Sequence, residues 1–144
     1  MSLTQLLVQT AVTFVAASLG ALFGALLIRR TERFKHLQEL QSAAYVDFLR
    51  GFARVGRAQR DSPRNERSVI EELEGRAIVT DSRSRIAVYG SRGVVLALSK
   101  FISLGTETLS PAGRQAFAEL CALMRMEAVK QVAPLEDVRT VLYG

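Results

Sequence analysis

The beginning of this chain is free of charge over an unusually long stretch. Residues 1–28 contain no charged side chain, and the run from Leu3 to Ile28 is mostly aliphatic, aromatic or small. A helix over that run rises roughly 39 Å, which exceeds the bilayer hydrocarbon core of about 30 Å. We therefore predict a transmembrane helix at residues 1–28, followed by a domain at residues 29–144.

The apolar run differs from a cleavable signal peptide. Such a peptide begins with basic residues and has an apolar core of about 7 to 15 residues. Here no Lys or Arg precedes the run, which continues well past the small residues at 16–18. An uncleaved anchor is the interpretation that this pattern favours.

Basic residues collect immediately after the predicted span. They are Arg29, Arg30, Arg33 and Lys35. Because positive flanks stay in the cytoplasm, we expect an outside N-terminus and a cytoplasmic C-terminal domain, with the protein in the inner (plasma) membrane. The net charge of +5 lies wholly after residue 28, so we expect these basic side chains to bind anionic lipid headgroups.

Small and polar residues share one face of the predicted span, within an arc of about 100°. They are Gln5, Gln9, Thr13, Ala16, Gly20 and Gly24. In lipid, small side chains let helix backbones approach closely, and polar ones bond across the contact. This predicts a homo-oligomer, or pairing with another membrane protein, through that face. Alternatively, Gln5, Gln9 and Thr13 line a pore.

The rest of the sequence predicts an all-α fold in which the transmembrane helix continues into a small helical bundle. Apolar residues recur at helical spacing to about Arg60, and a turn is expected at residues 61–65. A second helix is expected at Glu66–Tyr89, and we expect its inward residues to be Val69, Ile70, Leu73, Ala77, Ile78 and Val88. Gly90 is expected to end that helix, and Ser91 to cap a third one that ends near Gly105.

The last part of the chain predicts two further helices. Ser110 and Pro111 form a start signal for a helix through about Val132. A short helix is expected at Leu135–Leu142 after Pro134. No alternating strand pattern, internal repeat or low-complexity linker interrupts residues 29–144, so a single all-helical domain is the predicted organisation.

Three arginines on the first helix form a basic stripe. Arg50, Arg54 and Arg57 follow each other at steps of four and three. The stripe offers a site for an acidic partner. The alternative, which we favour, is that these arginines are solvated or pair with glutamates at 71–74 on the next helix. No aromatic residues interleave with the stripe, so nucleic acid is not an expected partner.

Residues typical of catalysis are few. Cys121 lies at helical spacing from Phe117 and Met124 and so belongs to an apolar core. No glycine-rich phosphate loop, nucleophile elbow or metal-spaced cluster of His and Cys occurs in the sequence. We expect no enzymatic activity, no cofactor and no metal.

Two resemblances bear on function. Arg30 and His36 resemble the Arg-x(4 to 6)-His motif of HEPN ribonucleases, which are all-helical, dimeric and metal-independent. That resemblance implies RNA cleavage by this pair. The layout of an uncharged anchor, then residues 45–49 on a long helix and residues 89–91 before a short one, resembles uncharacterised single-span bacterial membrane proteins. This second resemblance implies the same architecture and no activity.

The function expected from the sequence is a non-enzymatic, self-associating single-pass membrane protein that acts as a scaffold, accessory subunit or binding module. Membrane lipid and a second copy, or another membrane protein, are the expected partners. The alternatives are a small oligomeric pore-forming effector and a membrane-tethered HEPN-like ribonuclease.

Overall fold

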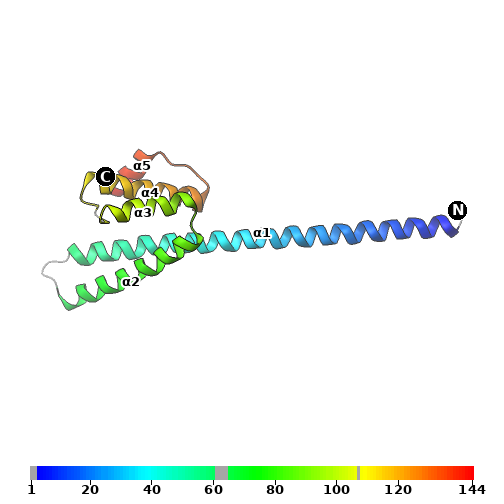
Figure 1. The fold of residues 1–144 in the computed structure, drawn as a ribbon, viewed down its shortest axis with the longest axis horizontal. Helices are drawn as coiled ribbons and strands as arrows, with labels where there is room; N and C mark the ends of the chain where they lie inside the picture. The colour runs from blue at the N-terminus through cyan, green and yellow to red at the C-terminus, as the bar shows by residue number, and fades with distance from the viewer. Residues whose placement is uncertain (1–2, 61–64, 107) are drawn as a thin grey trace. The chain divides into compact units, whose positions relative to one another are not determined.

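The computed structural model of the protein describes residues 3–60, 65–106 and 108–144, with side chains described from residue 30 onward. Its five helices in these residues are α1 (Leu3–Arg60), α2 (Glu66–Tyr89), α3 (Arg92–Ser103), α4 (Pro111–Val129) and α5 (Leu135–Tyr143) (Figure 1). No strand occurs in these ranges. The all-helical class is therefore confirmed.

The chain divides into two compact units. The first is Met1–Leu37, and the second is Gln38–Gly144. Within the residues searched, none of the helices combines the length and apolar character needed to cross a bilayer. The predicted span at residues 1–28 lies outside the residues whose side chains are described, so the transmembrane part of the fold prediction is not confirmed and stays a prediction.

The core of the second unit is a cluster of aromatic rings from three helices. Phe52 of α1 lies 4.9 Å from Phe117 of α4 and 5.6 Å from Phe101 of α3, between ring centroids. Such pairs add about 0.5–1.5 kcal/mol each beyond the area they bury. Phe48 stacks on Phe52 at 6.2 Å and is itself buried. The aromatic rings of Phe48 and Phe52 thus hold α3 and α4 against α1.

The helix starts follow the capping signals in the sequence. The Asn65 side chain accepts a hydrogen bond from the Ser68 N–H at 2.8 Å, and the Ser68 hydroxyl completes a capping box. The Ser91 and Ser110 side chains cap α3 and α4 by accepting hydrogen bonds from the backbone N–H groups of Val94 and Gly113. The predicted turn between α1 and α2 falls largely on residues 61–64, which lie outside the described residues.

Two helix ends differ from the prediction. α4 ends at Val129 rather than near Val132, because Lys130 adopts a left-handed conformation with φ of 58°. Gly90 follows α2 as predicted, but its backbone is extended, with φ of −69°. The glycine is needed there for space, since an added Cβ would lie 2.5 Å from the Ile86 carbonyl oxygen.

Two glycines bring α1 and α2 into backbone contact. A Cβ on Gly51 of α1 would lie 3.0 Å from the carbonyl oxygen of Gly75, and a Cβ on Gly75 would lie 3.1 Å from the carbonyl oxygen of Gly51. Side chains of Val55, Ile78 and Val79 close around this contact. The two helices pack at a distance that only glycine permits at these positions.

The predicted inward face of α2 is wrong. The buried residues of the helix are Ser68, Glu72, Gly75, Ser82 and Ile86. Val69, Ile70, Leu73, Ala77 and Val88, which we expected to face inward, are exposed, and Ile78 is partly buried. The buried face of α2 is centred on Gly75 and contains Ser68, Glu72 and Ser82 together with Ile86, so hydrophobicity alone does not mark the buried side.

The glycine contact predicts opposite effects for two alanine substitutions. Gly75→Ala should destabilise the fold by about 1–3 kcal/mol, because the added methyl meets backbone atoms that cannot yield. Gly56→Ala, at an α1 position with no atom within 4 Å of the added Cβ, should stabilise it by about 0.5–1 kcal/mol. Urea unfolding of both variants measures the difference, and equal stability would contradict the contact.

Candidate functional site

The basic residues after the predicted span are accessible. Arg30, Arg33 and Lys35 are exposed on the part of α1 that belongs to the first unit. The side chain of Arg29 lies outside the described residues. Exposure of this kind leaves the three cations available to an anionic surface, and lipid binding stays a prediction.

The residues of the predicted transmembrane interface also fall outside the described side chains. They are Gln5, Gln9, Thr13, Ala16, Gly20 and Gly24. Their backbone lies within the helical span of α1.

The predicted arginine stripe is largely engaged in ion pairs within the chain. Arg54 pairs with Glu74 of α2, and Arg50 Nη1 lies 3.4 Å from Asp47 Oδ1. Arg57 is exposed, and no ion pair joins it to a carboxylate in the described ranges. The pairing of Arg54 follows the favoured alternative, in which the stripe binds glutamates of the next helix rather than an external acidic partner.

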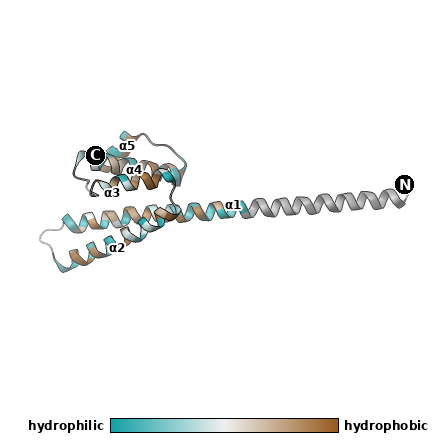
Figure 2. Cartoon of the chain, viewed as in Figure 1, coloured by the Kyte–Doolittle hydropathy of each residue, from teal (hydrophilic) through white to brown (hydrophobic). Residues whose placement is uncertain are grey.

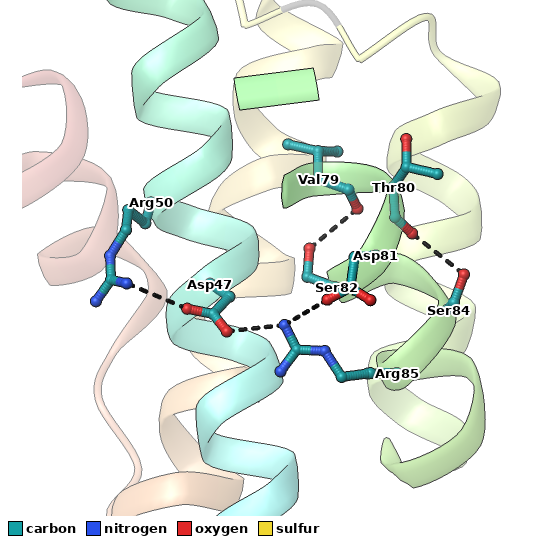
Figure 3. Close-up of polar contacts among 8 residues, drawn as sticks. All are labelled: Asp47, Arg50, Val79, Thr80, Asp81, Ser82, Ser84 and Arg85. Atoms are coloured by element: carbon teal, nitrogen blue, oxygen red, sulfur yellow. Dashed lines mark hydrogen bonds and ion pairs between the residues drawn. The ribbon is translucent and has the colours of Figure 1, made fainter. Parts of the chain in front are cut away.

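Two aspartates from different helices hold one guanidinium between α1 and α2 (Figure 3). Arg85 Nη2 lies 2.8 Å from Asp47 Oδ2 and 2.8 Å from Asp81 Oδ2. The hydrogen bond that Arg85 donates to Asp47 raises the pKa of Arg85 above its ordinary value, and the charges of both carboxylates raise it further. This cluster fixes the two helices to each other. The sequence shows no signal for the contact between Asp47 and Arg85, because these residues are 38 positions apart.

A glutamate on α4 ties three helices together. Both the phenol of Tyr45 and the hydroxyl of Ser91 donate to the Glu127 carboxylate. Burial raises the pKa of Tyr45 well above its ordinary value, and the Glu127 hydrogen bond and charge raise it further. The phenol therefore stays protonated and acts as a structural donor rather than a base.

The remaining chemical candidates do not form a catalytic group. Cys121 packs against the core, and burial raises the pKa of its thiol to about 12. Arg30 and His36 are both exposed on α1, and their six-residue separation places them about 120° apart around the helix. No group of His, Cys, Asp and Glu in the described parts of the chain could hold a metal ion.

A groove runs between α2 and α3 with a volume of about 560 Å³. It is lined by Thr80, Arg83, Ser84 and Ala87 of α2 and by Val95, Leu98, Ser99 and Ile102 of α3. Its α3 wall is mostly apolar, in keeping with the hydrophobic colouring of that helix in Figure 2. We call it the α2–α3 groove.

One side of α2 is exposed and uncharged along most of its length, and part of it, at Thr80, Ser84 and Ala87, also forms the α2 wall of the α2–α3 groove. We call it the α2 outer face and define it as Val69, Ile70, Leu73, Ala77, Thr80, Ser84, Ala87 and Val88, all exposed. On a helical projection these residues fall within about 100°. The sequence pattern contained this stripe, but we assigned it to the core because apolar helix faces are usually buried.

Comparison of the chain with protein-family models, with curated proteins and with solved structures found no match.

The raised pKa of Cys121 predicts a slow native reaction with thiol reagents. The thiolate is the reactive form, and at neutral pH almost none is present at a pKa of about 12. The stability linked to this thiol is complete below its ordinary pKa of 9.0 and is lost as pH rises toward 12. We expect labelling to accelerate strongly in urea, whereas equal rates in native and unfolded protein would contradict burial of the thiol.

Proposed function

We propose that this protein is a non-enzymatic single-pass membrane protein that self-associates and presents its helical second unit to the cytoplasm as a scaffold, accessory subunit or binding module. The observation that carries the proposal is the uncharged run at residues 1–28, which ends at a cluster of basic residues. An apolar run of that length spans a bilayer, and the cluster sets its orientation.

The described ionisable groups support a binding role over catalysis. Glu127 accepts hydrogen bonds from two helices, and Asp47 holds Arg85. Both carboxylates therefore have structural tasks. The second unit also has an exposed, uncharged surface, the α2 outer face. A surface of this kind is suited to contact with another protein.

The polar face of the proposed span supports self-association. Gly20 and Gly24 allow a close helix contact, and Gln5 and Gln9 on the same face gain by bonding across it. The same glutamines favour a second candidate function, a small oligomeric pore. Expression that depolarises the membrane would favour the pore, whereas an unchanged membrane potential would favour a packed interface.

Topology gives the first test of this proposal. A cytoplasmic reporter fused after Gly144 should be active, and alkaline phosphatase at the same site should be inactive, because the positive flank follows residue 28. The reverse activities would place the second unit outside. Recovery of the full chain in the soluble fraction would remove the anchor from the proposal.

The span interface gives the second test. Gly20→Leu with Gly24→Leu should weaken assembly, because the added side chains separate the helices. Leu19→Ala with Leu22→Ala, on the other side of the span, is the matched control and should assemble like the unaltered protein. Mass photometry in detergent measures both. Equal assembly of the two variants would move the interface away from this face.

A further inference from the structure

The α2 outer face has the spacing of a coiled-coil seam. Its central residues recur at alternating steps of three and four: Ile70, Leu73, Ala77, Thr80, Ser84 and Ala87. These steps keep one narrow stripe on one side of the helix, as a and d positions do in a heptad. Leu73 is 62% exposed and Ile70 is 49% exposed. Ile70, Leu73 and Ala77 are therefore uncovered in the single chain, and Thr80, Ser84 and Ala87 are exposed within the α2–α3 groove.

The hydroxyl groups on the seam are already satisfied. Thr80 Oγ1 donates to the Arg76 carbonyl at 2.9 Å, and Ser84 Oγ donates to the Thr80 carbonyl at 3.2 Å (Figure 3). Burying a hydroxyl without a partner costs free energy, but these two keep their bonds within their own helix. The polar positions of the seam are thus compatible with a helix packed over them.

Opposite charges flank the seam on its two edges. Arg76 and Arg83 occupy one edge at a seven-residue step, and Glu74 and Asp81 occupy the other at the same step. The Arg76 and Asp81 side chains also bind charged neighbours within α2, yet they remain 61% and 68% exposed. In heptad terms the arginines are at g and the acids are at e.

We propose that α2 pairs through this outer face with α2 of a second copy of the chain, in parallel and in register. In a parallel pair each g residue faces the e residue five positions later in the other helix. Arg76 then lies beside Asp81 of the partner subunit, and the two-fold symmetry of the dimer forms the same ion pair a second time. An antiparallel pair would set the arginine edges against each other, and such like-charge contacts are unfavourable.

The same register places Val88 against the second copy of the chain. Val88 is 72% exposed and occupies the next e position. Parallel pairing sets it beside Arg83 of the partner subunit, at the edge that leads into the partner's α2–α3 groove. The α3 wall of that groove is mostly apolar, and its α2 wall consists of Arg83 and three small residues. An exposed apolar side chain thus lies at the edge of a groove with one mostly apolar wall.

This interface deepens the proposed self-association by naming a second contact, outside the membrane. Pairing of the proposed spans would raise the effective concentration of the two α2 helices, and the outer face would then fix their direction. The two contacts involve separate residues, so each is tested without disturbing the other.

A cysteine scan of the full chain in membranes tests the pairing. On a Cys121→Ala background, single cysteines replace Ile70, Leu73 and Ala77 of the seam, and mild oxidation follows. Parallel, in-register pairing predicts a disulfide between identical residues at all three positions. Val129→Cys, at an exposed position of α4, is the matched control and should remain monomeric on a denaturing gel.

The outcomes separate this inference from the proposed function. Crosslinking at a single seam position indicates an antiparallel crossing and overturns the parallel register. No crosslinking, in a chain that still assembles by mass photometry, overturns the α2 interface and leaves the span interface standing. A second set of variants carries Ala77→Cys as the crosslinking position. Loss of this crosslink on adding Ile70→Glu with Leu73→Glu supports the seam. Val129→Glu, at an exposed α4 position, is the control and should retain the crosslink.

Discussion

The second unit depends on the contact between Gly51 and Gly75. Each glycine lies where a methyl group would meet the backbone of the other helix. The buried face of α2 is therefore centred on a glycine and includes Ser68 and Ser82, while the Ile78 and Val79 side chains pack beside the contact. The same contact lets short aspartates reach across, and Asp47 can hold Arg85 at 2.8 Å. Packing geometry, rather than apolar area, determines how α2 binds α1.

The hydrophobic effect acts mainly on the other side of α1. Phe48 and Phe52 face α3 and α4, where their rings meet Phe101 and Phe117. The α1 helix therefore has two kinds of interface, an aromatic one toward α3 and α4 and a glycine-centred one toward α2 that also holds the Asp47–Arg85 ion pair. The apolar residues of α2 are left for a surface that the single chain does not cover, which is the physical basis for inferring a second copy there.

The sequence predicted the helices well and the faces of α2 poorly. Ser91 and Ser110 mark helix starts because capping is a local interaction between neighbours in sequence. The buried aromatic residues of α1 followed from periodicity for a similar reason. Leu73 misled us because periodicity locates an apolar stripe but not what covers it. Asp47 with Arg85, and Tyr45 with Glu127, join residues far apart in the chain and have no local signal.

The central claim is that α2 presents its apolar stripe to a second chain in parallel. A dipolar distance measurement between spin labels tests it directly, with one label replacing Arg67 near the start of α2 in the full chain in bilayers. Parallel pairing predicts a short separation between the labels of the two chains, on the order of two helix diameters or about 20 Å. An antiparallel crossing at the middle of α2 would give more than about 30 Å. That longer distance, or no dipolar coupling at all, would contradict the account.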